Sequence, residues 1–328
     1  MVFVPSYIKS FQNGSLRKTL TQSENTLKSC NICPRDCNID RTNGEVGYCQ
    51  SSSLPAVSAY SPHFGEEPIL SGKYGAGNIF FGNCNLNCVF CQNYEISQAQ
   101  NQTKPSEISC EKLAEIMIEL QNKKCHNIGL VSPTHYSVQI IRAVNSAVEK
   151  GLHLPLVYNS NGYDSVEMLK LFEGIVDIYL PDFKYGNNEN AKKYSKAKNY
   201  FENAKNAIRE MYRQVGSDLI YDGDIVVRGL IIRHLVLPNS LAESELVFKF
   251  IAEELSPDIH ISLMSQYYPT NKAEKYILIN RKIYQSEFDR TVELMNKYGL
   301  TKGWIQNIDS SDNYRPHFNL NPKNPFNN

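Results

Sequence analysis

The chain has 328 residues, of which 41% are hydrophobic, and its 34 Lys+Arg balance its 34 Asp+Glu. This length suffices for one large α/β domain or two ordinary ones, and the balanced charge predicts no binding to nucleic acid or to an anionic membrane. No run approaches the roughly 18 apolar residues of a membrane-spanning helix, and Pro5 interrupts the N-terminus too early for a secretory signal, so we expect a cytoplasmic protein.

Four cysteines gather near the N-terminus, within residues 30–49: Cys30, Cys33, Cys37 and Cys49. The chain holds nine cysteines, an odd number, which favours metal ligation over a disulfide framework. A closed four-thiolate site can hold zinc as a structural centre or an iron–sulfur cluster as an electron relay. The spacing leaves both readings open, with unligated buried thiols as a third and weaker one.

A second cysteine motif is more specific. Cys84, Cys88 and Cys91 follow the spacing Cys-x3-Cys-x2-Cys, and the aromatic residue Phe90 precedes the third. Three thiolates on one short loop can ligate three irons of a cubane [4Fe–4S] cluster. The fourth iron then keeps an open position, which distinguishes a catalytic metal site from a closed structural one. Three ordinary half-buried cysteines are the alternative.

From residue 78 onward, short β-branched runs alternate with segments of helical period. The predicted strands are residues 78–81, 127–132, 154–160, 175–180, 229–237 and 259–265. This alternation predicts a parallel sheet with crossover helices, and six strands without an evident seventh predict an incomplete TIM-like (β/α)6 barrel. We expect the chemistry at the carboxyl ends of the strands, where the second cysteine motif falls.

The predicted organisation has three parts. Residues 1–51 form an N-terminal segment with the four-cysteine metal site, residues 52–300 the partial barrel, and residues 301–328 a loose C-terminal tail. Capping boxes are expected where Asp164 precedes Glu167 and where Ser240 precedes Glu243. Outside the two motifs, Cys110 and Cys125 are interpreted as small buried hydrophobes.

Polar residues follow several predicted strands. Asn159, Ser160 and Asn161 lie at the end of the third strand, and Asp182 and Lys184 follow the fourth. A lysine can pair with a ligand carboxylate, and an aspartate can accept from an ammonium or a hydroxyl. An ion pair and turn residues without a ligand are the alternative.

Two more strand ends carry candidate residues. On the fifth strand Arg233 and His234 are consecutive, so only one of them can face the barrel interior. After the second strand, Ser132 and Thr134 could accept from an ammonium, but the segment 131–136 offers no carboxylate. His135 is read as a structural histidine or a substrate contact.

The loop around Cys84, Cys88 and Cys91 resembles the signature of radical S-adenosylmethionine (SAM) enzymes. Together with residues 62–68, the N-terminal cysteines and the Cys91-Gln92-Asn93 continuation, it resembles the pyruvate formate-lyase activating enzyme-like proteins over about residues 5–300. The resemblance implies that a [4Fe–4S] cluster cleaves SAM reductively, and that the resulting 5′-deoxyadenosyl radical abstracts a substrate hydrogen. It further implies an electron donor of the flavodoxin or ferredoxin type and a substrate that is a protein, a peptide or a metabolite.

The resemblance also assigns roles at the strand ends. It places Asn159, Ser160 and Asn161 near the SAM ribose, Asp182 and Lys184 near its polar groups, and Arg233 at its carboxylate. Thr134 lies in the segment where the activating enzymes have Gly-Gly-Glu, which receives the SAM amino group. The contrasting hypothesis is a non-enzymatic iron–sulfur or zinc protein for electron transfer or scaffolding, with Cys110, Cys125 or a histidine as a fourth ligand.

Overall fold

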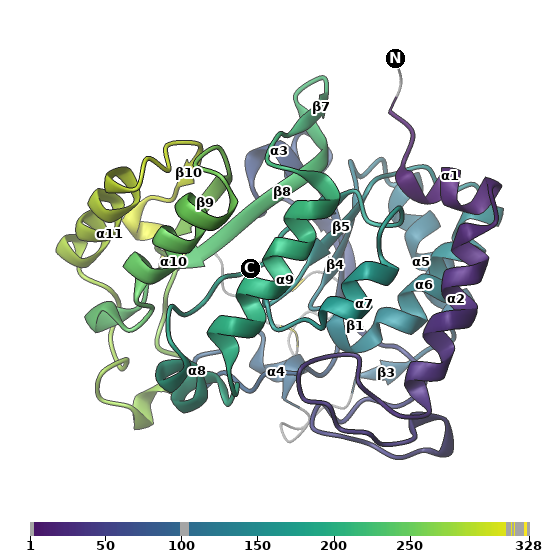
Figure 1. Cartoon of the computed structure of the whole chain (residues 1–328), viewed down its shortest axis with the longest axis horizontal. Coiled ribbons are helices and arrows are strands. Elements are labelled where there is room, and N and C mark those ends of the chain that lie inside the picture. The colour runs from purple at the N-terminus through teal and green to yellow at the C-terminus, as the bar shows by residue number, and fades with distance from the viewer. Residues whose placement is uncertain (1–2, 99–104, 313–315, 317, 319–324, 327–328) are drawn as a thin grey trace.

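A curved mixed sheet forms the centre of the protein (Figure 1). The computed structural model describes residues 3–98, 105–312, 316, 318 and 325–326. Seven strands of the sheet run parallel, in the order β10-β9-β8-β6-β5-β4-β2. They are β2 (Ala76–Phe81), β4 (Ile128–Val131), β5 (Leu156–Asn159), β6 (Ile178–Tyr179), β8 (Ile225–Leu235), β9 (His260–Met264) and β10 (Gly303–Ile305).

The six predicted strands are confirmed, and the sheet is consistent with a partial TIM barrel. The seventh parallel strand, β10, was not predicted and falls where a tail was expected. The other side of the sheet is antiparallel: β1 (Ala56–His63) pairs with β2, and β3 (Ser106–Glu107) pairs with β1. A hairpin joins β7 (Ile220–Asp222) to β8.

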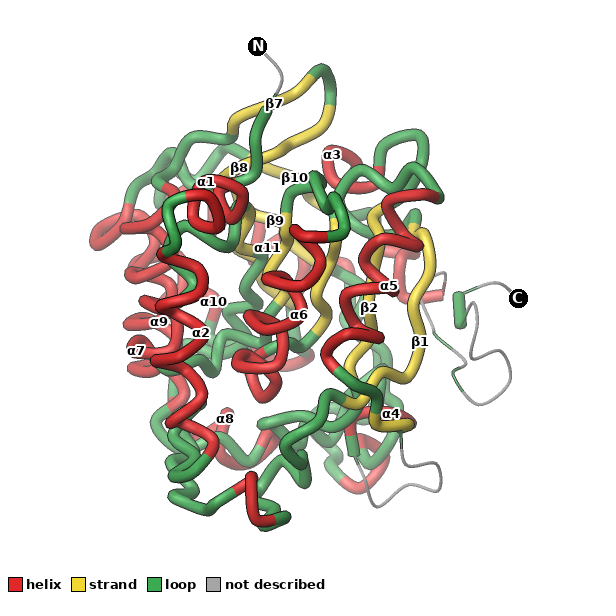
Figure 2. Tube along the Cα trace, turned by 90° about the vertical axis from the view of Figure 1, so that its right-hand side faces the viewer, coloured by secondary structure: helices red, strands yellow, loops and turns green. Residues whose placement is uncertain are grey.

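Helices connect the parallel strands and cover the outer face of the sheet (Figure 2). The connecting helices are α5 (Cys110–Asn122), α6 (Ser137–Glu149), α7 (Val166–Leu171), α8 (Asn188–Ser195), α9 (Tyr200–Val215), α10 (Ser244–Phe250) and α11 (Gln285–Lys297). Shorter helices are α3 (Pro68–Ser71) and α4 (Tyr94–Ser97), and the N-terminal pair is α1 (Ser6–Gln12) and α2 (Ser15–Glu24). Within the described ranges, no helix is long and apolar enough to span a membrane.

Strand alternation separates two apolar layers. On β8, Leu230 and Ile232 join the large core between sheet and helices, whereas Ile231 joins a smaller cluster with Val157 and Leu70. Because side chains two positions apart on a strand share a face, Arg233 continues the face of Ile231. The smaller cluster therefore forms an apolar floor inside the barrel, and polar residues lie above it at the strand ends.

Both predicted capping boxes are wrong. Helix α7 has Ser165 at its N-cap, and Asp164 instead accepts from buried side chains. Helix α10 has Glu243 at its N-cap, with no side-chain cap. Part of the expected tail lies outside the described residues, but Phe318 is buried and packs on Phe80, with ring centroids 5.5 Å apart.

Candidate functional site

The loop with Cys84, Cys88 and Cys91 begins directly after β2. Asn83 has a φ of 66°, which turns the chain sharply at the end of the strand. The Val89 amide donates to the Tyr194 carbonyl at 2.8 Å and anchors the loop to the end of α8. The three thiols line one cavity of about 220 Å³, together with residues from the ends of β4, β5, β6, β8 and β9.

The environment of these thiols fits a metal cluster. Burial raises the pKa of Cys84 to about 12 and that of Cys91 to about 11. The Lys184 ammonium opposes this effect of burial at both thiols, and it lines the same cavity. Buried thiols become thiolates when a metal ion compensates their charge, so a convergent buried set with a nearby cation suits an iron–sulfur cluster.

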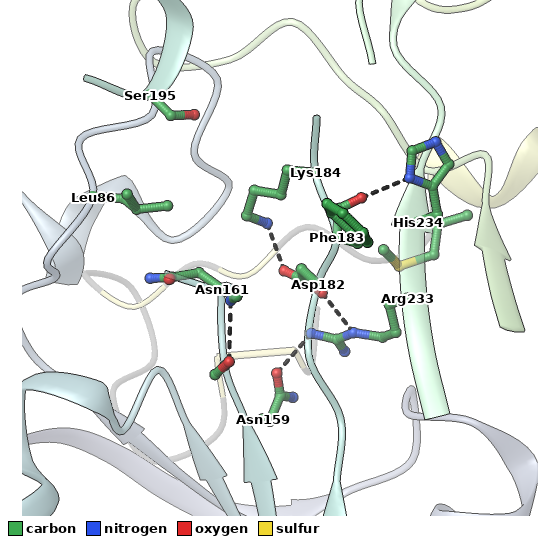
Figure 3. Close-up of polar contacts among 12 residues, drawn as sticks. Leu86, Asn159, Asn161, Asp182, Phe183, Lys184, Ser195, Arg233 and His234 are labelled. Atoms are coloured by element: carbon green, nitrogen blue, oxygen red, sulfur yellow. Dashed lines mark hydrogen bonds and ion pairs between the residues drawn. The ribbon is translucent and has the colours of Figure 1, made fainter. Parts of the chain in front are cut away.

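A charged network faces this cavity (Figure 3). Asp182 lies between Lys184, whose Nζ is 2.5 Å from Oδ2, and Arg233, whose Nε is 2.8 Å from Oδ1. Arg233 also donates to Oδ1 of Asn159 at 2.6 Å and to Oε2 of Glu66 at 3.2 Å. Burial alone would raise the pKa of Asp182, but the two cations hold it below its ordinary value. The network is therefore ionised and largely buried, at the place where a charged ligand would be recognised.

The structure brings most of the predicted ligand-binding residues to this cavity. Its lining includes Asn159, Ser160, Asn161, Asp182, Lys184 and Arg233. His234 lies on the other side of β8, where it contacts the Phe183 carbonyl and the Ser244 hydroxyl. Asn161 links the strand end to the cysteine loop, because its amide donates to Oδ1 of Asn85 at 2.7 Å.

Thr134 is placed differently from expectation. Its hydroxyl donates to Oδ1 of Asp164 at 2.7 Å, inside a buried cluster with Tyr158 and Ser160. Ser132, rather than Thr134, belongs to the cavity lining, and it has a φ of 56°. Thr134 therefore fixes the turns after β4 and β5 and does not line the cavity.

Glu66 is the cavity residue that the sequence analysis missed. It follows β1, and its Oε1 accepts from Asn78 at 2.8 Å while its Oε2 accepts from Arg233. The segment after β4 offers no carboxylate, yet Glu66 brings one to the cavity from an earlier part of the chain. Its position inside a partial barrel becomes evident only when β1 is recognised as a strand paired with β2.

The N-terminal cysteines also converge. Cys30, Cys33, Cys37 and Cys49 line one small enclosure beside Arg41 and His135. Burial raises the pKa of Cys30 and of Cys33, which suits thiols that are deprotonated by a metal. Within the described part of the chain, no three His, Cys, Asp or Glu side chains are arranged to hold a single metal ion.

Arg35 connects the two cysteine sets. It lies between Cys33 and Cys37 in sequence, and its Nε donates to the Asn85 carbonyl at 2.8 Å, next to Cys84. Its guanidinium is 3.6 Å from the ring centroid of Tyr48 and 5.3 Å from that of Tyr163. The N-terminal segment therefore packs directly on the loop that carries Cys84, Cys88 and Cys91.

The two remaining cysteines, Cys110 and Cys125, line neither the cavity nor the N-terminal enclosure.

The chain was compared with protein families, with other sequences and with solved structures. The sequence profile of the radical SAM superfamily matches residues 78–235. An uncharacterized protein of Methanocaldococcus jannaschii is 36% identical over 289 residues, which cover 85% of this chain and 77% of that protein. A second uncharacterized protein of the same organism is 30% identical over 184 residues, covering 51% of this chain and 52% of that protein. The solved structure of methylornithine synthase is 16% identical with a TM-score of 0.46, covering 74% of this chain and 67% of that chain.

The chain belongs to the radical SAM superfamily. Members of this superfamily are enzymes, and membership implies a [4Fe–4S] cluster and SAM as cofactors. The sheet described above is the α/β fold of this superfamily.

Proposed function

We propose that this protein is a radical SAM enzyme in which Cys84, Cys88 and Cys91 hold the [4Fe–4S] cluster. When bound, the cluster and SAM supply the one-electron chemistry that generates a 5′-deoxyadenosyl radical for hydrogen abstraction. The observation that carries the proposal is the convergence of three thiols and the polar ends of β5, β6 and β8 on one cavity. Residues around that cavity bind and orient SAM and keep water away from it.

The charged network supports a specific division of roles. Lys184 and Arg233 offer cations to the SAM carboxylate, and Asp182 holds both side chains in position through its two oxygens. Glu66 offers a carboxylate for the SAM amino group, in place of the one that the segment after β4 lacks. Asn159 and Asn161, at the end of β5, are proposed to contact the ribose.

For the finer role we propose a reaction like that of the pyruvate formate-lyase activating enzymes. The substrate would then be a C–H bond of a partner polypeptide, such as a glycine backbone, and a flavodoxin-type or ferredoxin-type protein would supply the electron. The support is the likeness of the cysteine loop and of residues 62–68 to those enzymes.

A second metal centre at Cys30, Cys33, Cys37 and Cys49 is part of the proposal. The four thiols line one enclosure, and their segment contacts the cysteine loop through Arg35. An auxiliary iron–sulfur cluster there would relay electrons. Zinc would stabilise the N-terminal segment, but the described thiols are not arranged around a single ion, so they would have to move to bind it.

Anaerobic reconstitution with iron and sulfide, followed by SAM and dithionite, tests the central proposal. We expect 5′-deoxyadenosine as a product and an EPR signal of the reduced cluster that changes when SAM is added. The Cys84/Cys88/Cys91→Ala variant is the control and should give neither. A wild-type protein that forms a cluster but yields no 5′-deoxyadenosine and no SAM-dependent signal would refute the proposal.

A further inference from the structure

A second and larger cavity opens beside the cysteine cavity. It measures about 670 Å³ and lies between the segment 64–72 on one side and β9, β10 and residues 306–310 on the other. We call it the lateral cleft. It shares Gly65, Glu66, Arg233, Met264 and Gln266 with the cysteine cavity, so the two adjoin each other. Its volume lies within the range of about 300–1,000 Å³ that is usual for small-molecule sites.

The lateral cleft has a buried carboxylate on its wall that lacks a full set of partners. Glu67 is only 8% exposed, and its Oε2 has no hydrogen-bond partner among the described residues. Arg233 acts on Glu67 through its charge, but its guanidinium hydrogen-bonds to Asp182, Glu66 and Asn159. Burial raises the pKa of Glu67, with Arg233 opposing the shift by its charge and Ser262 by a hydrogen bond.

The charges around the lateral cleft leave one negative charge in excess. Of the described residues that line it, Glu66 and Glu67 are acidic and Arg233 is the one basic residue. Because Arg233 is already shared between Glu66 and Asp182, the carboxylate of Glu67 is the group left over. A buried carboxylate without a cation is costly, and a ligand cation placed beside it removes much of that cost.

Aromatic side chains complete the wall. Phe64 is 63% exposed at the mouth of the cleft, and Trp304 of β10 lines it from the opposite side. The flat faces of aromatic rings attract cations and also cover an alkyl chain. A carboxylate with aromatic neighbours is an arrangement that recognises an alkylammonium ion.

We propose that the lateral cleft binds the alkylammonium group of the substrate, with Glu67 as its anionic partner and Phe64 and Trp304 as its apolar walls. Its role as a substrate site rests on the proposed function, because the cleft adjoins the cavity of Cys84, Cys88 and Cys91. The alkyl chain of the substrate would extend from Glu67 past Met264 toward that cavity. The ammonium belongs to a free amine or to a lysine side chain, which share this chemistry.

Binding can be measured without turnover, because Trp304 is the only tryptophan of the chain. We expect n-butylammonium to change the tryptophan fluorescence saturably at pH 8, and n-butanol and butyrate, which have the same chain length, to bind at least about tenfold more weakly. A capped lysine amide that binds more tightly than n-butylammonium assigns the site to a lysine side chain, and weaker binding assigns it to a free amine. Equal responses to butylammonium and butanol would overturn the proposal.

Two variants sharpen the test. Glu67→Gln keeps the shape and removes the charge, so we expect affinity for n-butylammonium to fall about tenfold while the weak binding of n-butanol stays unchanged. Glu111→Gln changes an exposed carboxylate on α5, outside the cleft, and should bind as wild type does. Thermal unfolding of both variants verifies that they fold. Undiminished binding by a folded Glu67→Gln protein would refute the role of this carboxylate.

The outcome is separable from that of the proposed function. Fluorescence titration needs neither cluster nor SAM, whereas formation of 5′-deoxyadenosine needs both. Loss of the ammonium preference with intact SAM cleavage refutes the cleft assignment alone. Charge-selective binding in a protein that never cleaves SAM upholds the ammonium site and refutes the radical SAM activity.

Discussion

The Nε of Arg233 donates to Oδ1 of Asp182 at 2.8 Å, although 51 positions separate the two residues in sequence. The contact exists because the chain after β6 runs beside β8, where the two residues form a parallel bridge. Asp182 and Arg233 are about 15% exposed or less, and the same guanidinium reaches Glu66. Removing one member of such a buried set leaves the others with uncompensated charge.

We predict that Arg233→Met lowers the free energy of unfolding by about 3 kcal/mol, because Glu66 loses its cation and Asp182 keeps only Lys184. Urea denaturation at neutral pH measures the change. The control is Arg209→Met, which breaks a pair with Glu254 at sites about 40% exposed. That variant should lose under about 1 kcal/mol, since exposed ion pairs contribute little. Equal losses in the two variants would mean that the Arg233 network does not stabilise the fold.

Measurements of metal content should show which metal each of the two cysteine sets binds. We predict that Cys84/Cys88/Cys91→Ala lowers the iron and sulfide of the anaerobically reconstituted protein by about four of each per chain, because a cubane cluster loses its ligands. A Cys30/Cys33/Cys37/Cys49→Ala variant should lose either about four irons or about one zinc. Chemical assays of iron, sulfide and zinc give the answer.

The matched control for the iron assay is the double variant Cys110→Ala, Cys125→Ala. Both cysteines are buried, but neither lines the cysteine cavity or the N-terminal enclosure. We expect full iron content, whereas a loss would revive the hypothesis that one of them supplies a fourth ligand. Retention of the full wild-type iron content by the Cys84/Cys88/Cys91 variant would contradict the cluster assignment itself.

The strands that the sequence predicted are those buried on both faces. All six residues of β2 and all four of β5 are buried, so these strands read as continuous apolar runs. The missed strands lack that signal. Strand β1 contains a proline and is only partly buried, and β10 has three residues, Gly303, Trp304 and Ile305, whose apolar pair resembles any short loop segment.

At the site, the sequence predicted which residues follow each strand but not all their partners. Because side chains alternate along β8, Arg233 and His234 must point to opposite faces of the sheet. In the structure Arg233 lines the cavity, and His234 hydrogen-bonds to Phe183 and Ser244 on the other face. Glu66 and the orphaned Glu67 could not be found this way. Both residues follow β1, a strand that the hydrophobic pattern did not reveal, and the unpartnered Oε2 of Glu67 produces no sequence pattern.

SAM binding should depend on Lys184. We predict that Lys184→Met weakens the affinity for SAM about tenfold, because a charge-assisted hydrogen bond to the ligand is lost and Asp182 keeps only Arg233. Equilibrium dialysis with the cluster-loaded protein measures this without reductant. Lys170→Met, at an exposed pair on α7, is the control and should bind SAM normally. An unchanged affinity in Lys184→Met would exclude this lysine from the SAM site.

Asp177 should make stability depend on pH. It is buried below β5 and accepts from the Ser6 amide at 2.8 Å and the Leu156 amide at 3.3 Å, and burial raises its pKa to about 6. Between about pH 4 and pH 6, Asp177 therefore stays protonated in the folded protein, whereas it is already ionised in the unfolded chain. The contribution of Asp177 to stability should fall as the pH rises from about 4 to 6 and then level off, by up to about 3 kcal/mol in total.

The variant Asp177→Asn isolates this effect, because its side chain cannot titrate. We predict that wild type loses stability relative to Asp177→Asn as the pH rises from 4.5 to 6.5. Above about pH 7 the difference in their unfolding free energies should stay constant. Urea denaturation of both proteins in the same metal-loaded state measures the difference. Glu111→Gln should follow the wild-type curve. A wild-type to Asp177→Asn difference that does not change with pH over this range would mean that Asp177 is ionised throughout, stabilised by its two amide donors and by the charge of Arg228.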